Sequence, residues 1–366
     1  MRGMQNPAVR RASVCLLLAL SSLVALVAQS PAPAAGPAAG GGAGTVERIK
    51  VHGVSLEGSL LGDSPDRDVA VFLPPSYKAS PQKRYPVVYM LHGYTDNVGQ
   101  WWGDVKHFVN VPEAIRQTLG DSAAGVNEMI LVMPNAYTRY QGSFYSSSIA
   151  TGDWETFVTK ELVAYIDKTY RTVAKAESRG LYGHSMGGYG AVRLGMRHPD
   201  VFSSVYAASA CCLTPPSLNP ADPKRMERLR AITGPDDVAK ADFGMKAFFA
   251  TAAAWSPNPA NAPLFVDLPV KDDGQVRPEI ISKWAANAPL AMADQYIGHL
   301  KSLRALAFDV GDKDGLAPGS LRLHELLDTY RVAHTYETYD GDHLNKIHER
   351  LRTKVFPFFS KNLARP

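Results

Sequence analysis

Gly183-His184-Ser185-Met186-Gly187 is the stretch of sequence that decides the fold. It follows a short apolar run, Arg179 to Tyr182, and stands at the start of a helical pattern that continues from Tyr189 to Arg197. A G-x-S-x-G pentapeptide between a strand and a helix predicts a tight elbow that exposes the serine hydroxyl. Glycines suit such an elbow because a larger residue would clash with the backbone. We therefore expect Ser185 to be a nucleophile.

Apolar strand-like runs alternate with helical patterns on both sides of this elbow. That alternation is typical of a mainly parallel sheet with helices on both faces and right-handed crossovers. Together with the elbow it predicts an α/β-hydrolase fold. The predicted strands are Val69–Leu73, Pro86–Leu91, Met129–Met133, Arg179–Tyr182, Val205–Ala208, Arg304–Asp309 and Thr335–Tyr339, and the clearest predicted helices are Asp153–Tyr170, Tyr189–Arg197, Ser320–Tyr330 and Lys346–Lys361.

A serine hydroxyl becomes a good nucleophile only when a base takes its proton, so a histidine and an acid are expected later in the chain. His343 directly follows the last predicted strand, which places it at the same edge of the sheet as Ser185. The acid should follow the preceding strand, where Asp309, Asp312 and Asp314 all stand. Asp309 belongs to the strand end and Asp312 suits a role in the turn. We take Asp314 as the acid, with the other two as alternatives.

Two backbone N–H groups are expected to bind the oxyanion of an acyl-transfer reaction. Met186, the residue after the nucleophile, supplies one of them. The second fits the turn after the strand that ends at Leu91, and we assign it to the amide of Tyr94. His92 lies in the same turn but precedes the nucleophile, so we expect it to hold the loop and not to act as the base.

The N-terminus resembles an export signal. A basic stretch is followed by the uncharged apolar run from Val14 to Ala28, which is too short to span a bilayer comfortably. We predict a signal peptide over residues 1–28, a Pro/Ala/Gly-rich linker over 29–44 and an esterase domain over 45–366, hence a secreted or periplasmic protein. A membrane anchor is the alternative, although no stable anchor is expected.

Composition excludes several classes of protein. The chain of 366 residues is 45% hydrophobic and 20% charged, which argues against disorder. The formal net charge is +4, and three arginines of the predicted signal account for most of it, so nothing favours nucleic acid as a partner. There is no H-E-x-x-H, no phosphate loop and no cysteine pair with zinc spacing. We expect neither a cofactor nor a metal site.

A Pro-rich stretch of about 90 residues after the strand ending at Ala208 interrupts the alternation of strands and helices. We predict an insertion over about 213–300 that forms a cap over the catalytic edge of the sheet, or else a decoration away from it. Cys211 and Cys212 precede it. Adjacent cysteines rarely bridge, so we expect them to pack as small apolar residues, with a redox pair as the alternative.

Several pieces of the chain resemble the esterase D family of α/β hydrolases. The pieces are Phe72 to Tyr77, Leu91 to Gly93, Ser143 to Ser146 with Trp154 to Phe157, Gly183 to Gly188, Gly311 to Asp314 and Gly341 to His343. The family includes feruloyl and other carbohydrate esterases, S-formylglutathione hydrolases and mycolyltransferases. Its pattern of Gly, two residues and Asp falls on Asp314.

Together with the predicted export signal, the resemblance implies a secreted serine carboxylesterase that acts on a small-molecule or polysaccharide-linked ester, such as a feruloyl ester. Trp101, Trp102 and Phe144 are candidate aromatic walls for the acyl group, or else core residues. An acyltransferase of the mycolyltransferase type would use the same triad. The alternative from another class is a non-catalytic binding protein on a hydrolase scaffold.

Overall fold

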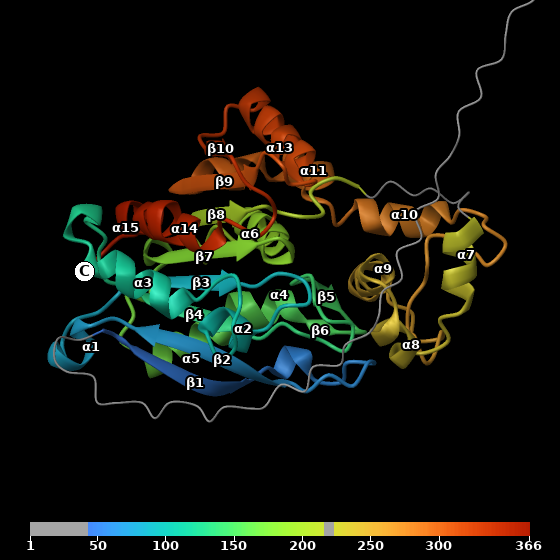
Figure 1. Ribbon diagram of the computed structural model, residues 1–366, viewed down its shortest axis with the longest axis horizontal. Helices are drawn as coiled ribbons and strands as arrows, with labels where there is room; N and C mark the ends of the chain where they lie inside the picture. The colour runs from blue at the N-terminus through green and yellow to red at the C-terminus, as the bar shows by residue number, and fades with distance from the viewer. Residues whose placement is uncertain (1–42, 216–222) are drawn as a thin grey trace, which may run out of the picture. The chain divides into compact units, whose positions relative to one another are not determined.

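The computed structural model describes residues 43–215 and 223–366, and Gly41–Pro366 forms one compact unit. The predicted signal peptide, nearly all of the linker and residues 216–222 of the predicted insertion lie outside the described residues. An eight-stranded sheet runs through this unit (Figure 1). In spatial order its strands are β1 (Thr45–His52), β2 (Asp66–Leu73), β4 (Ile130–Pro134), β3 (Val87–Leu91), β7 (Arg179–His184), β8 (Ser204–Ala208), β9 (Ala305–Gly311) and β10 (Thr335–Tyr339).

Six neighbouring strands, from β4 to β10, pair in parallel, whereas β2 pairs antiparallel with both β1 and β4. The α/β-hydrolase fold that the elbow predicts is therefore present. Leu91 pairs with Gly183, and Ala208 pairs with both His184 and Asp309. Since these residues end or nearly end their strands, the loops after β3, β7, β8 and β9 meet at one edge of the sheet.

Helices cover both faces of the sheet, each over its own apolar core. One face carries α5 (Leu162–Thr169), α6 (Met186–Arg197) and α13 (Ala317–Thr329). The other carries α2 (Val98–Trp102), α3 (Val111–Gly120), α14 (Ile347–Arg350) and α15 (Phe356–Asn362). The predicted helices Asp153–Tyr170 and Lys346–Lys361 are each present but contain a π-helical segment, Phe157–Glu161 and Leu351–Val355.

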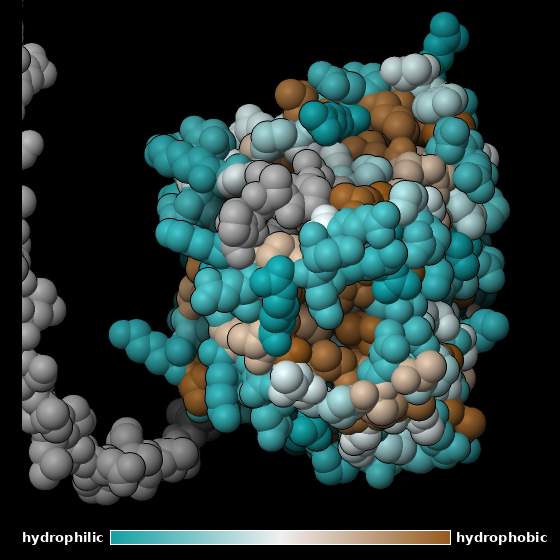
Figure 2. Space-filling model, turned by 90° about the vertical axis from the view of Figure 1, so that its right-hand side faces the viewer, coloured by the Kyte–Doolittle hydropathy of each residue, from teal (hydrophilic) through white to brown (hydrophobic). Residues whose placement is uncertain are grey.

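The segment between β8 and β9 is an insertion, as predicted. Its helices are α7 (Pro223–Arg230), α8 (Pro235–Lys240), α9 (Phe243–Trp255), α10 (Pro278–Ala285), α11 (Pro289–Met292) and α12 (Ile297–Ser302). In Figure 1, α7 to α10 lie beyond the end of the sheet toward which the parallel strands point. Figure 2 looks onto that side, where hydrophilic residues surround a hollow with a hydrophobic floor.

No described helix combines the length and the apolar character needed to cross a bilayer.

Candidate active site

The turn from β7 into α6 is the sharp elbow that the pentapeptide predicts. Ser185 has φ 56° and ψ −115°, a conformation that a non-glycine residue rarely adopts. A Cβ on Gly183 would lie 1.9 Å from the carbonyl oxygen of Gly187, and one on Gly187 would lie 1.9 Å from that of Leu91. Both contacts are with backbone and have no room to relax. Only glycine fits at either position, and the strained turn leaves the Ser185 side chain partly exposed.

Ser185, His343 and Asp314 form one hydrogen-bonded chain. The Oγ of Ser185 lies 3.0 Å from Nε2 of His343, and Nδ1 of His343 lies 2.8 Å from Oδ2 of Asp314. Asp342 holds the histidine loop, because its Oδ1 accepts the N–H groups of Leu344 and Asn345. The side chain of Asp314 is 3% exposed and that of His343 is 33% exposed.

The charge of Asp314 is stabilised by its partners. Burial alone would raise the pKa of this carboxyl group, but the hydrogen bond with His343 and the N–H of Leu316 outweigh burial and lower it. The Leu316 N–H lies 2.9 Å from Oδ1, so each carboxylate oxygen accepts its own donor. Since the pKa is lowered, Asp314 is ionised at neutral pH and can stabilise a positively charged imidazole.

The two other candidate acids have different partners. Asp309 is buried and forms an ion pair with Arg350, at 2.6 Å. Asp312 accepts the N–H of Gly341 at 3.0 Å and so joins the turn after β9 to the loop before His343. Of the three carboxylates in this stretch, only that of Asp314 hydrogen-bonds His343.

Met186 directly follows the serine, and the side chains of Met186 and Tyr94 both approach Gly142. Met186 begins α6 and Ser185 provides no side-chain cap, so the Met186 N–H is one of the unpaired groups at the positive end of a helix. Within the described residues neither this N–H nor that of Tyr94 has a hydrogen-bond acceptor. A Cβ on Gly142 would lie 2.6 Å from the side chains of both residues, so the loop around Gly142 packs across them.

Two buried histidines support the loops around Ser185. His92 accepts the N–H of Ala136 at Nε2, 2.8 Å, and therefore donates from Nδ1 to the carbonyl oxygen of Gly93, 2.9 Å. It holds the loop, as predicted from its position. His184, which the sequence pattern did not single out, donates from Nε2 to the backbone carbonyl oxygen of His343, 3.0 Å.

His184 is electrically neutral at physiological pH. Burial, and secondarily the neighbouring His343, lower its pKa to about 3. The ring centroids of His184 and His343 lie 4.7 Å apart. A charged His184 at this distance would oppose protonation of His343, so a neutral ring positions the His343 backbone without that cost.

The tryptophans proposed as acyl-pocket walls are core residues. Trp101 and Trp102 are 0% and 4% exposed, and both belong to the core on the α2 and α3 face of the sheet. The indole N–H of Trp101 donates to Asp96. The prediction is wrong for these two residues, because α2 turns their aromatic faces into the protein and leaves no surface for a ligand.

Phe144 is also a core residue, at 3% exposed, but it belongs to an aromatic cluster that reaches the insertion. Its ring lies 6.2 Å from that of Tyr94, 6.1 Å from that of Tyr189 and 5.4 Å from that of Trp255 at the end of α9. At the other end of α9, Phe243 lies 5.7 Å from Tyr94 and is 66% exposed. The insertion is thus packed against the loop that carries a candidate oxyanion amide.

The two cysteines lie beside the elbow. Both are free and partly buried against the main core, and the N–H of Cys211 donates to the Ser185 carbonyl oxygen at 3.1 Å.

Comparison with known proteins agrees with this architecture. Over 152 residues the chain is 32% identical to Esterase Rv1288 of Mycobacterium tuberculosis. This match covers 41% of this chain and 30% of the relative. Over 184 residues it is 26% identical to an endo-1,4-beta-xylanase/feruloyl esterase of Xylanibacter ruminicola. This second match covers 48% of this chain and 24% of the relative. The matches therefore span less than a third of the length of these curated relatives.

Solved structures share the fold. A ferulic acid esterase superposes with a TM-score of 0.60 at 23% identity, over 87% of this chain and 99% of the other. An S-formylglutathione hydrolase of Staphylococcus aureus superposes with a TM-score of 0.57 at 15% identity, again over 87% and 99%. A family model described as Putative esterase matches residues 64–349, a range that contains every residue of the hydrogen-bonded chain described above. The chain therefore belongs to the Putative esterase family, and it shares the α/β-hydrolase fold of these solved structures.

Proposed function

We propose that this protein is a carboxylesterase in which Ser185 is the nucleophile, His343 the general base and Asp314 the acid that orients the base. The hydrogen-bonded chain between the three side chains, 3.0 Å and 2.8 Å in its two steps, carries the proposal. Both distances lie within the range needed for proton transfer and for orientation of the base. An intact chain of this kind disfavours a non-catalytic binding protein.

In the first step, Ser185 Oγ attacks the ester carbonyl carbon while Nε2 of His343 takes the hydroxyl proton. The N–H groups of Tyr94 and Met186 donate to the oxyanion of the tetrahedral intermediate, and the N-terminus of α6 adds favourable charge. His343 then gives the proton to the leaving alcohol. A water molecule, activated in turn by His343, hydrolyses the acyl-enzyme and restores Ser185.

We propose an aromatic or sugar-linked ester as the substrate. The partly exposed ring of Tyr94 and the exposed ring of Phe243 lie 5.7 Å apart, beside the buried rings of Phe144 and Trp255, and they would form the surface that contacts a flat aryl acyl group. Two of the similar proteins are named as feruloyl or ferulic acid esterases, which hydrolyse esters of this kind. We further propose that α9 acts as a cap, since Phe243 and Trp255 reach the cluster from its two ends.

We also propose that the protein is exported, from the basic and apolar character of residues 1–28. An enzyme outside the cytoplasm would meet polysaccharide-linked esters directly. Cleavage is tested by N-terminal sequencing of the protein secreted by its host, and an N-terminus within the first few residues would contradict the proposal.

A panel of esters tests the function. Purified protein and Ser185→Ala are compared on p-nitrophenyl esters of increasing chain length, methyl ferulate and acetylated xylan. We expect turnover of methyl ferulate to exceed that of long-chain esters, and Ser185→Ala to lose several orders of magnitude in kcat with an unchanged circular-dichroism spectrum. Comparable activity of the variant would exclude Ser185 as nucleophile. Acylated sugar formed in the presence of a sugar acceptor would identify an acyltransferase instead.

A further inference from the structure

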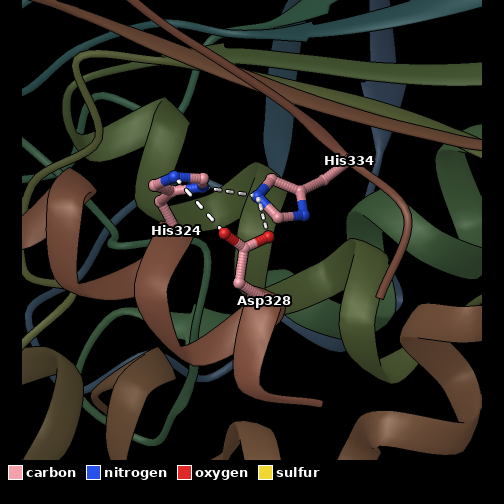
Figure 3. Close-up of side chains that lie close together, drawn as sticks. All are labelled: His324, Asp328 and His334. Atoms are coloured by element: carbon pink, nitrogen blue, oxygen red, sulfur yellow. Dashed lines mark hydrogen bonds and ion pairs between the residues drawn. The ribbon is translucent and has the colours of Figure 1, made fainter. Parts of the chain in front are cut away.

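Two histidines and an aspartate meet at the end of α13 that lies away from the candidate active site. His324 and Asp328 stand one helical turn apart on α13, and His334 immediately precedes β10 (Figure 3). Asp314 precedes the start of α13 and His343 follows the end of β10. The cluster therefore connects the end of α13 to the start of β10, whereas Asp314 and His343 flank the start of α13 and the end of β10.

The three side chains point toward one another. One ligand atom of each lies within 4.8 Å of the others. A ring nitrogen of His324, Nδ1, lies 2.8 Å from Nε2 of His334, and the other, Nε2, lies 3.5 Å from Oδ2 of Asp328. Nε2 of His334 lies 3.9 Å from Oδ1 of Asp328. Figure 3 shows the carboxylate facing both rings.

His334 is held so that its second ring nitrogen, Nε2, faces the other two side chains of the cluster. Its Nδ1 donates to the carbonyl oxygen of Val332, 2.7 Å, which places the lone pair of the neutral ring on Nε2. The side chain is 3% exposed, and its ring stacks on Phe308 at 5.5 Å. Metal-binding histidines are typically oriented in this way, with the second ring nitrogen donating to a backbone carbonyl group.

The hydrogen bond between the two histidines leaves a lone pair of His324 facing the negative carboxylate of Asp328. When His324 donates from Nδ1 to His334, the Nε2 of a neutral His324 directs its lone pair toward the carboxylate of Asp328. Within the described residues no lysine or arginine pairs with Asp328. A cation held between the three groups would replace two repelling acceptors by favourable contacts.

We propose that His324, Asp328 and His334 bind a divalent transition-metal ion, with Zn²⁺ as the best match. Two imidazole nitrogens and one carboxylate oxygen are ligands that Zn²⁺ prefers, whereas Mg²⁺ and Ca²⁺ prefer oxygen alone. The side chains of Asp328 and His324 are 63% and 32% exposed, so water completes the coordination shell.

Little movement is needed for binding. Tetrahedral zinc separates two ring nitrogens by about 3.3 Å, so the 2.8 Å between His324 and His334 must open by about half an ångström. Asp328 and His324 can make this adjustment because they lie at the surface. No such site was expected from the sequence, since His-x3-Asp-x5-His is not one of the zinc spacings considered.

The bound ion would join the C-terminal end of α13 to the start of β10. β10 is an edge strand that pairs only with β9 within the described sheet. The ion's role is therefore to stabilise this edge, on which the loop carrying His343 depends, and the ester hydrolysis reaction does not pass through it.

Zinc titration of tag-free, metal-free protein by calorimetry tests the proposal. The wild-type chain is compared with His324→Ala, at a partly exposed position, with Asp328→Asn, at an exposed position, and with His299→Ala as the control for loss of a histidine at the surface. We expect one zinc ion per chain for wild type and His299→Ala, with affinity at least about tenfold weaker in the other two variants. Zinc should also raise the Tm of the wild-type protein and of His299→Ala. Bound Co²⁺ should give visible ligand-field absorption in these two proteins and not in the other two variants.

Equal zinc affinity in all four proteins would overturn the proposal, because the ion would then bind at other side chains. Absence of zinc binding and of any Tm change in the wild-type protein would also overturn it, and the cluster would be a hydrogen-bonded network alone.

Discussion

Replacement of Asp314 by Asn should abolish most of the activity through the wrong tautomer of His343. The carboxylate accepts the N–H of Leu316 at Oδ1 and lies 2.8 Å from Nδ1 of His343 at Oδ2. In Asp314→Asn, the amide oxygen must stay opposite the Leu316 N–H, so the amide NH₂ faces His343. His343 then accepts at Nδ1 and carries its proton on Nε2, where it cannot take the proton of Ser185.

The expected loss is about 10⁴-fold in kcat, or about 5.4 kcal/mol of transition-state stabilisation. KM should change little, because Asp314 is 3% exposed and does not reach a bound ester. The charge removed is present under assay conditions, since the pKa of Asp314 is lowered from its ordinary value. Turnover of p-nitrophenyl acetate at pH 7 measures the effect, and thermal unfolding followed by circular dichroism verifies the fold.

Asp312→Asn is the matched control. Asp312 accepts the N–H of Gly341 through one oxygen, which an asparagine oxygen can replace, so we expect less than about tenfold loss in kcat. A greater loss in Asp312→Asn than in Asp314→Asn would refute the assignment of the acid. Near-wild-type activity of a folded Asp314→Asn variant would refute it as well.

Three further substitutions test the elbow, a buried ion pair and the cap. Gly183→Ala should destabilise the fold by about 3 kcal/mol or more, since its Cβ would meet the Gly187 backbone, whereas Gly298→Ala in α12, with open space around it, should be neutral or stabilising in the same urea unfolding assay. Glu155→Gln should cost about 3 kcal/mol at pH 7, because the side chain is 10% exposed and pairs with two arginines. Burial would raise the pKa of Glu155, but its hydrogen-bonded and charged partners outweigh burial and lower it. The stability that the ionised carboxylate contributes is therefore fully present above about pH 4.5 and is lost on acidification. The difference in unfolding free energy between wild type and Glu155→Gln should shrink as the pH of the assay is lowered. Phe243→Ala should change stability by less than about 0.5 kcal/mol, because the ring is 66% exposed. It should raise KM for methyl ferulate and not for p-nitrophenyl acetate, and an unchanged KM for methyl ferulate would argue against the cap.

The parts of the fold that depend on local sequence were predictable. The strands from β2 to β10 that form the main sheet were predicted to within a few residues, because most of them are buried and read as continuous apolar runs. β1 was missed. It contains Glu47, Arg48 and Lys50 and lies at the edge of the sheet, where polar side chains reach solvent, so the sequence lacks that apolar signal.

Contacts between distant residues limited prediction of the site. Three aspartates within six positions look alike in sequence, and Asp309 is distinguished by Arg350, which lies 41 positions away. Trp101 and Trp102 were misassigned because composition does not reveal which face of α2 is buried. The part of His184 in holding the His343 backbone depends on a contact across 159 positions, and no local pattern reports it.

Covalent labelling tests the central claim most directly. The purified protein is treated with a fluorophosphonate probe, digested, and the modified peptide is identified by mass spectrometry. We expect a single adduct on Ser185, formed at a rate that falls steeply in His343→Ala and is zero in Ser185→Ala, in parallel with the loss of ester hydrolysis. An adduct on another residue, or full ester hydrolysis by protein that the probe does not modify, would contradict Ser185 as the nucleophile.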